Sequence, residues 1–90
     1  MNLLTKALRA EFAKRGQQDG DSAVVLAKFF TPDSSWTWYA TEFDGVDTFF
    51  GLVQGMETEL GYFSLTEMSS ARGPLGLGIE RDLYWRRCTL

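Results

Sequence analysis

Histidine is absent from this 90-residue sequence, and cysteine occurs only once, as Cys88. The missing imidazole excludes Ser-His-Asp and Cys-His nucleophilic centres and metal sites built on histidine. A single cysteine cannot form a disulfide within the chain, and such a thiol is typical of a reducing compartment. We therefore expect a cytoplasmic, non-enzymatic protein with no catalytic residues, no bound metal and no cofactor.

Long hydrophobic runs are also missing. The sequence contains no stretch of about 18 apolar residues and no charged-then-apolar leader, so we expect no membrane span and no cleaved segment. The hydrophobic fraction of 44% and the aromatic fraction of 14% are high enough for one compact core. We expect a single domain over residues 1–90 that needs no disulfide or metal for support.

Basic residues are absent from the middle of the chain. Residues 29–71 contain no Lys or Arg and carry a net charge of −7, whereas the segments on either side each carry +2. An acidic surface repels nucleic acid and attracts basic surfaces of other proteins. Two interpretations remain open: the acids form a partner-binding face, or they keep an aromatic-rich sheet soluble. The small positive excess at each end disfavours direct DNA binding.

The first element is predicted to be a helix over residues 3–15. Leu4, Leu8 and Phe12 recur every four residues and form an apolar stripe, and Gly16 follows as a stop signal. This stripe is more typical of core packing than of an interface. We expect it to face the body of the domain.

Strands are predicted to follow the helix, at residues 23–30, 35–43, 48–53 and 61–65. The second and third flank Asp44-Gly45-Val46-Asp47 and form a hairpin. A short helical turn is expected at 66–70, and residues 79–86 form either a fifth strand, which their Ile, Leu, Tyr and Trp favour, or a short helix. The predicted fold class is α+β: an N-terminal helix packed on an antiparallel sheet of four to five strands, with the helical turn before the last segment.

The aromatic residues of the second predicted strand alternate between two faces. Trp36 and Trp38 share one face and Tyr39 lies on the other. Nucleic-acid platforms interleave Lys or Arg with their stacking rings, and this strand has neither, so we expect both tryptophans in the core. Tyr39 is the ring that we keep as a candidate for a partner contact.

Three carboxylates cluster around the predicted hairpin turn: Glu42, Asp44 and Asp47. They could hold a divalent cation, but the spacing of an EF-hand with its closing Glu is missing. Paired carboxylates that hydrolyse glycosides need a sugar-sized cleft, which a small single-sheet domain seldom provides. The Gly-rich run at residues 73–78 lacks the Lys-Ser/Thr of a P-loop and is interpreted as a turn.

Two long motifs carry a resemblance to a known family. They are KFFTPDSSWTWYATEFDGVDTFFGLVQGMETELGYFSL at residues 28–65 and RGPLGLGIERDLYW at residues 72–85. Together with the opening LLT at residues 3–5, they resemble a family of small bacterial proteins known only as a domain of unknown function. Gly78 departs from the family's ending, where a proline is expected, and this change affects only a loop.

The resemblance implies a biological setting rather than an activity. Members of that family are typically encoded on plasmids, integrated elements and phages, often near antirestriction-type genes. This setting implies an accessory role against host defence, as an antirestriction or anti-CRISPR protein. Such inhibitors are commonly small and often acidic, and some act as DNA mimics.

The residues and the resemblance together predict a protein-binding accessory protein that inhibits a host defence nuclease through an acidic face. The expected partner is a basic surface of a nucleic-acid-handling complex, either a CRISPR effector or a restriction enzyme. The chain itself would be a monomer or a homodimer paired through sheet edges. The predicted contact residues are Glu42, Asp44, Asp47, Glu57, Glu59 and Tyr39.

Other functions remain as alternatives. One is a nucleic-acid-associated factor that uses the basic N- and C-terminal segments, with the C-terminal arginines gathered beside the N-terminal helix. These arginines are Arg72, Arg81, Arg86 and Arg87. A small hydrolase or ligand-binding domain that works through carboxylates would need a concave pocket, and an uncharacterised domain with no inhibitory role is the last alternative.

Overall fold

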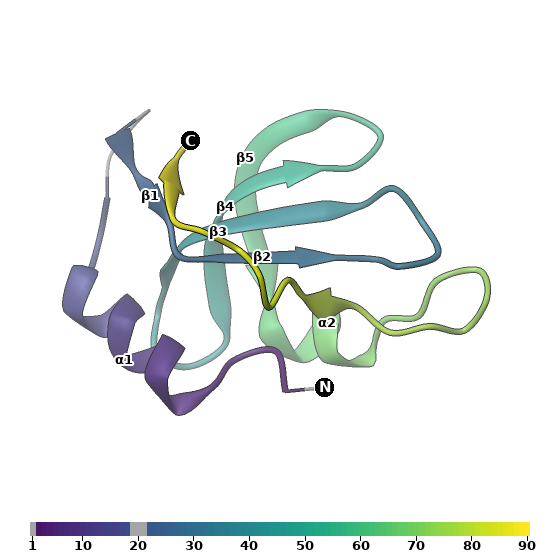
Figure 1. Cartoon of the computed structure of the whole chain (residues 1–90), viewed down its shortest axis with the longest axis horizontal. Coiled ribbons are helices and arrows are strands. Elements are labelled where there is room, and N and C mark those ends of the chain that lie inside the picture. The colour runs from purple at the N-terminus through teal and green to yellow at the C-terminus, as the bar shows by residue number, and fades with distance from the viewer. Residues whose placement is uncertain (1, 19–21) are drawn as a thin grey trace.

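A five-stranded antiparallel sheet forms the framework of the molecule (Figure 1). The structure is a computed structural model and describes residues 2–18 and 22–90. The sheet has the strand order β5-β4-β3-β2-β6. In chain order its strands are β2 (Ala27–Phe30), β3 (Thr37–Phe43), β4 (Thr48–Gln54), β5 (Thr58–Ser64) and β6 (Glu80–Arg81).

Two short strands and two helices make up the rest of the regular structure in residues 2–18 and 22–90. Strand β1 (Val24–Val25) pairs with β7 (Cys88–Thr89) in a separate two-stranded ribbon. Helix α1 (Lys6–Arg15) packs beside the sheet, and helix α2 (Leu65–Ser70) follows β5 (Figure 1). The predicted α+β class is confirmed, as are the N-terminal helix and the short helical turn before the last segment.

Helix α1 begins after Thr5, whose side-chain oxygen accepts a hydrogen bond from the N–H of Leu8 at 3.2 Å. It ends at Gly16, whose φ of 66° suits a residue without a side chain. Phe12 is only 1% exposed, and its ring centroid lies 5.7 Å from that of Phe49 on β4. The helix starts later than predicted because Thr5 caps it, and its apolar stripe faces the core as expected.

The single strand predicted over residues 23–30 is divided in the structure. β1 pairs with β7 and β2 pairs with β3, with Leu26 between the two. Leu26 still donates its N–H to the carbonyl of Ala40 at 2.9 Å. A run of apolar residues without alternation gives no sign of which strand each part will pair with, so the division is not visible in the sequence.

Strands β3, β4 and β5 form a meander joined by tight turns. The hairpin of β3 and β4 is confirmed at the predicted turn, where Gly45 adopts a φ of 86°. β5 begins at Thr58, earlier than predicted, and pairs with β4 in one uninterrupted register. The buried Phe49 ring stacks on that of Phe63, with their centroids 5.3 Å apart, and this contact joins β4 and β5 to the core.

A β-bulge at Thr41 exchanges the two faces of β3 near its end. The register with β4 shifts between Ala40 and Glu42, and the adjacent residues Ala40 and Thr41 are both buried. Beyond the bulge, Phe43 packs in the core with its ring 4.7 Å from that of Phe49. Glu42 is thereby directed to the opposite face, whereas simple alternation would place Glu42 and Phe43 the other way round.

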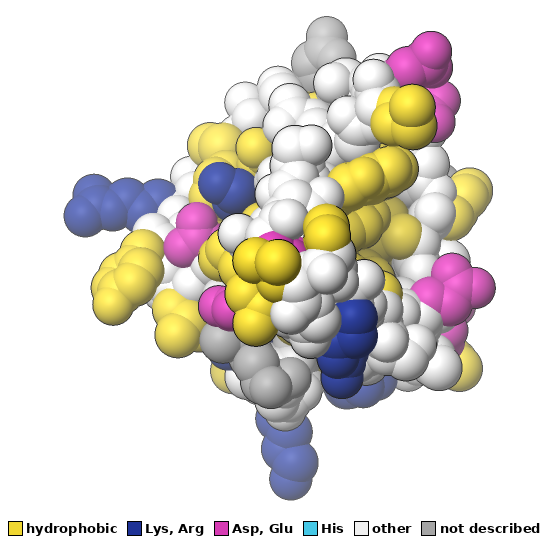
Figure 2. Space-filling model, turned by 90° about the vertical axis from the view of Figure 1, so that its right-hand side faces the viewer, with side chains coloured by type: hydrophobic (Ala, Val, Ile, Leu, Met, Phe, Trp, Pro, Cys, Tyr) yellow, Lys and Arg dark blue, Asp and Glu magenta, His cyan; other side chains and the backbone are white. Residues whose placement is uncertain are grey.

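Apolar side chains are exposed at the end of the molecule where the β2–β3 turn, the β4–β5 turn and the Gly-rich loop meet (Figure 2). The prediction that both tryptophans lie in the core is wrong for Trp36, which is 38% exposed. Its ring lies over Gly55 and stacks on Trp38 at 6.0 Å, and Trp38 is partly buried against the core. β3 begins only at Thr37, so Trp36 belongs to the turn and not to the alternating strand.

The last segment is neither a long strand nor a helix. Within residues 79–86 only β6 is regular, and it pairs with the end of β2. Asp82 then accepts a hydrogen bond from the N–H of Tyr84 at 2.9 Å, which turns the chain back toward β7. The β2–β3 turn holds the Gly-rich loop in place, because Asp33 Oδ2 accepts a hydrogen bond from the N–H of Leu75 at 2.8 Å.

Candidate functional site

The six predicted contact residues lie in separate parts of the molecule. Glu42 and Asp44 are near the β3–β4 turn, where both line one pocket. Glu57 and Glu59 are exposed at the β4–β5 hairpin, at the opposite end of β4. A seven-residue strand of about 20 Å separates the two turns, so these acids do not form one continuous surface.

Tyr39 lies on the same sheet face as Glu42 but is covered by the C-terminal segment. Its ring centroid is 5.7 Å from that of Trp85, and its hydroxyl donates to Gln54 Oε1 at 3.3 Å. The ammonium of Lys28 lies 5.8 Å from the Tyr39 ring centroid and 5.7 Å from that of Trp85. Tyr39 therefore already has an internal cation and an aromatic neighbour, which leaves little of it for a partner.

Asp44 shapes the β3–β4 turn. Its Oδ1 accepts hydrogen bonds from the N–H groups of Val46, Asp47 and Thr48 at 2.8, 2.8 and 3.0 Å. Hydrogen bonds from these backbone donors, that of Thr48 first, hold the pKa of Asp44 below its ordinary value. The carboxylate is thus a charged group that is fixed by the turn and lines the pocket.

Asp47 connects the same turn to the start of α2. Its Oδ2 accepts from the hydroxyl of Ser64 at 2.6 Å, and its Oδ1 accepts from the N–H and the hydroxyl of Thr66 at 2.8 and 2.6 Å. These bonds, led by that of Ser64, lower the pKa of Asp47, and the nearby charge of Asp44 opposes them. Both oxygens are occupied within the chain, so Asp47 has a structural role.

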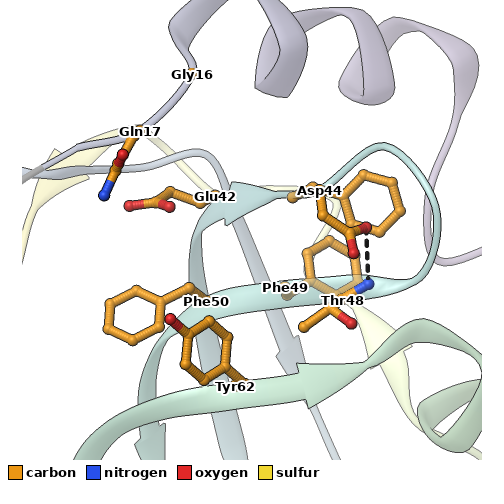
Figure 3. Close-up of a pocket in the computed structure, with 9 residues that line it drawn as sticks. Gly16, Gln17, Glu42, Asp44, Thr48, Phe49, Phe50 and Tyr62 are labelled. Atoms are coloured by element: carbon orange, nitrogen blue, oxygen red, sulfur yellow. Dashed lines mark hydrogen bonds between the residues drawn. The ribbon is translucent and has the colours of Figure 1, made fainter.

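A pocket of about 310 Å³ lies where the end of β3 faces β4, β5 and the end of α1 (Figure 3). We call it the acidic-aromatic pocket. It is lined by Gly16, Gln17, Glu42, Phe43, Asp44, Thr48, Phe49, Phe50 and Tyr62. In Figure 3 the carboxylate of Glu42 lies on one side and the rings of Phe50 and Tyr62 on the other, with the opening between them.

Glu42 is held in this position by Gln18 and the bulge. The backbone N–H of Gln18 donates to Glu42 Oε2 at 3.0 Å. The Gln18 amide nitrogen donates to the carbonyls of Thr41 and Val24 at 2.8 and 3.0 Å, and its oxygen accepts from the Val24 N–H at 2.7 Å. The segment after α1 is thus fastened to the bulge that turns Glu42 toward the pocket.

The aromatic side of the pocket is a pair of rings from neighbouring strands. Phe50 and Tyr62 occupy directly paired positions of β4 and β5 and meet edge to face, with their centroids 4.9 Å apart at 61°. A ring face carries negative potential that attracts a cation, and a carboxylate opposite the ring adds a full charge. This arrangement suits a cationic group that can lie between carboxylate and rings.

A related contact already exists next to the pocket. The guanidinium of Arg9 lies 5.2 Å from the ring centroid of Phe43, which is one of the lining residues. Arg9 also donates to the carbonyl of Gly45 at 3.1 Å. One aromatic ring that lines the pocket, that of Phe43, therefore already has a guanidinium beside it within the chain.

Phe50, Tyr62 and Gln18 were not among the predicted contact residues. The alternation of β4 does place Phe50 on the face opposite Phe49, and this could have drawn attention to it. Nothing in the sequence reveals that Glu42 joins them, because that depends on the bulge at Thr41. Among the described residues, no group of three His, Cys, Asp or Glu side chains is arranged to hold a metal ion.

Comparison with known proteins identifies the family. The sequence profile of DUF2958, described as a protein of unknown function, matches residues 2–89. The chain belongs to the DUF2958 family. No curated protein and no solved structure matches it. Neither helix in the described part of this DUF2958 protein is long and apolar enough to span a bilayer.

The predicted gathering of C-terminal arginines beside α1 holds in part. Arg87 forms an ion pair with Glu11 of α1 at 3.0 Å, and Arg81 donates to the carbonyls of Asn2 and Leu3 at 2.7 and 3.2 Å. Arg72 lies elsewhere. Its guanidinium donates to the carbonyls of Ser69 and Ala71 at 3.2 and 2.7 Å, at the end of α2.

Proposed function

We propose that this chain is a non-enzymatic protein-binding domain that captures an Arg or Lys side chain of its partner in the acidic-aromatic pocket. The observation that carries the proposal is the placement of Glu42 opposite the Phe50 and Tyr62 rings (Figure 3). Hydrophobic lining with a few fixed polar groups is typical of recognition sites.

An arginine of the partner fits the pocket best. Its planar guanidinium can stack on an aromatic face and bond a carboxylate at the same time, whereas a lysine offers a compact charge. A cation over a ring contributes about 0.5–2 kcal/mol, and more as the group loses water. An ion pair with the half-buried Glu42 stays in contact with water and contributes modestly, so a useful affinity needs further contacts around the pocket.

The surroundings of the pocket favour a basic protein surface as the partner. None of the described residues that line the pocket is Lys or Arg, and Asp44, whose pKa is lowered by backbone hydrogen bonds, lines it as a second acid beside Glu42. Basic grooves of this kind are found on proteins that handle nucleic acid. We extend the proposal to a host defence nuclease, a restriction enzyme or CRISPR effector, inhibited in the bacterial cytoplasm, in keeping with the mobile-element setting of the resemblance.

Capture of a purified restriction enzyme or CRISPR effector on immobilised protein, followed by a cleavage assay, tests this function. The wild type is expected to retain one such complex, release it as salt rises, and inhibit its cleavage of DNA. The double variant Glu42→Gln, Tyr62→Ala should lose at least tenfold in affinity. Glu57→Gln, Glu59→Gln, a matched pair outside the pocket, should bind as the wild type does. Equal loss in both double variants would contradict the pocket as the contact.

One observation favours nucleic-acid association as a second candidate. The ion pair with Glu11 brings Arg87 next to Lys14 and Arg15. Glu11, Lys14, Arg15 and Arg87 together line a polar cleft of about 430 Å³. A mobility shift on single- and double-stranded DNA at low salt separates the two functions. A shift that is lost in Lys14→Glu, Arg87→Glu would support the basic cleft, and the protein-binding proposal predicts no shift.

A further inference from the structure

The five-stranded sheet has a free edge at β5. β5 is the last strand in the order β5-β4-β3-β2-β6, and no strand of the described residues pairs with its outer side. The strand is seven residues long and pairs with β4 from Thr58 to Ser64 without a register shift. A long regular edge of this kind is a ready template for another strand.

Proteins usually protect such edges with charged side chains, above all Lys, or with Pro, a bulge or a very short strand. β5 has the sequence TELGYFS, in which Glu59 is the one charged residue; the strand contains neither Lys nor Pro, and its pairing shows no bulge. The opposite edge of the same sheet is protected, because β6 is only two residues long and an irregular segment follows it. This contrast indicates that the β5 edge is suited to pairing.

The direction of the backbone groups on β5 follows from one hydrogen bond. The N–H of Leu65 donates to the carbonyl of Asp47 at 2.8 Å, as a continuation of the β4–β5 ladder. In an antiparallel ladder, residues that bond the neighbouring strand alternate with residues that face away. The residues whose N–H and C=O groups face the free edge are therefore Thr58, Leu60, Tyr62 and Ser64.

We propose that two copies of this chain pair antiparallel through β5, about a two-fold axis at Gly61. In this register Leu60 bonds the partner's Tyr62 and Thr58 bonds the partner's Ser64, so each outward-facing group finds a counterpart. The side chains of Leu60 and Tyr62, which are 54% and 77% exposed in the single chain, then cover their counterparts on one face. The strand sequence is self-complementary in this sense.

The absence of a side chain at Gly61 is consistent with this register. A side chain at this position would have nothing within 4 Å, and the residue is not among the glycines of positive φ, so the fold of one chain does not require a glycine there. A glycine inside a strand often marks the close approach of another backbone. In the proposed pair the two Gly61 residues form the non-bonded position on the axis, where the Cα atoms approach to about 4.5 Å.

The pairing would place two acidic-aromatic pockets on one continuous sheet face. The partner's Leu60 would lie against Tyr62 and extend the aromatic side of each pocket. Two linked pockets would bind a partner with two basic groups more tightly than either pocket alone. The pairing is nevertheless independent of the proposed function, because it needs no third protein.

The pairing of two copies and the binding of a basic partner are expected to depend on salt in opposite ways. Glu57 and Glu59 lie near the ends of the proposed seam, and residues 29–71 contain no basic residue to offset them, so screening should strengthen the pairing of two copies. Binding of a basic partner should weaken under the same change. Failure of one prediction therefore leaves the other intact.

Analytical ultracentrifugation over a range of concentrations tests the pairing. The mass is expected to rise with concentration from 10.2 kDa toward twice that value. In higher salt the same rise should occur at a lower protein concentration. Leu60→Lys should raise the dissociation constant at least tenfold. Leu60→Pro should do the same without loss of folding, because it removes only an outward N–H. Leu83→Lys, at a leucine that is 63% exposed elsewhere, should behave as the wild type does.

Cysteine trapping tests the register. Gly61→Cys in a Cys88→Ser background should form an interchain disulfide on mild oxidation, because the paired Cα atoms lie in the range that a disulfide spans. Ser34→Cys in the same background, an exposed position in the β2–β3 turn, should form no interchain disulfide under the same oxidation. A chain of 10.2 kDa at every concentration, or dimers unaffected by both Leu60 variants, would overturn the proposal. Equal trapping at residues 61 and 34 would overturn the register.

Discussion

At the scale of single residues, Gln18 holds Glu42 in its position. Its side chain bonds backbone groups of Val24 and Thr41, and its backbone N–H bonds the Glu42 carboxylate. The three backbone groups reached by its side chain lie where β1 and the bulge in β3 leave the regular ladder. The pocket therefore depends on a residue that does not line it.

Gln18→Ala is expected to lower the free energy of unfolding by roughly 1–3 kcal/mol, because it leaves partly buried backbone groups without their partners. Urea denaturation measures this change. Gln17→Ala is the matched control, since Gln17 is exposed, and should stay within about 0.5 kcal/mol of the wild type. Equal stability of the two variants would show that Gln18 does not hold the bulge.

Gly73 and Gly61 offer a second comparison between single residues. A methyl group at Gly73 would collide with the carboxylate of Asp33, the group that holds the Gly-rich loop, whereas one at Gly61 would meet nothing within 4 Å. Gly73→Ala is expected to cost roughly 1–3 kcal/mol of stability. Gly61→Ala should be neutral or stabilising by about 0.5 kcal/mol. Thermal unfolding of dilute protein measures both, and the reverse order would contradict the packing of Asp33 on the loop.

At the scale of elements, the sequence predicted what alternation and turn residues encode. The β3–β4 hairpin was visible because clear alternation flanks Asp44-Gly45. Helix α1 was visible because Leu4, Leu8 and Phe12 recur every four residues, although Leu4 lies just before the helix in the structure. The bulge at Thr41 was not visible, because it goes with a contact between elements distant in the sequence: beyond it the Phe43 ring lies 6.2 Å from that of Phe12 on α1. The pocket was missed for the same reason: three elements meet there only after the bulge has formed.

The β3–β4 turn joins two elements through Asp44 and Asp47, and this gives a pH dependence. Both groups have a lowered pKa in the folded chain, so each releases its proton more readily when folded than when unfolded. Their contribution to stability is therefore complete above the unfolded value of about 3.9 and is lost as pH falls through the lowered folded pKa.

Urea denaturation between pH 2 and 6 is expected to show this loss below about pH 4. Asp47→Asn should flatten the curve in that range, since the variant no longer has the carboxylate that accepts from Ser64 and Thr66. Glu59→Gln is the control because Glu59 is exposed on β5. A wild-type curve as flat as that of Asp47→Asn would rule out this role of the turn.

At the scale of the whole molecule, charge is separated along the fold. The ion pair of Arg87 with Glu11 places the basic C-terminal segment beside α1. The predicted contact acids divide between the two ends of β4, with Glu42, Asp44 and Asp47 at one end and Glu57 and Glu59 at the other. The sequence predicted the total charge of each segment but not this division, because charge totals do not contain strand order. A local pocket, rather than one acidic face, follows from the structure.

The most direct test of the pocket is a titration of isotope-labelled protein with two peptides, followed by NMR. The peptides would be identical except that one carries arginine where the other carries citrulline, which has nearly the same shape without the charge. We predict that the arginine peptide shifts the signals of Gly16, Glu42, Phe50 and Tyr62, that the shifts fade with salt, and that Glu42→Gln reduces them at the same peptide concentration. Equal shifts from both peptides, or shifts confined to α1 and the C-terminal arginines, would contradict the account.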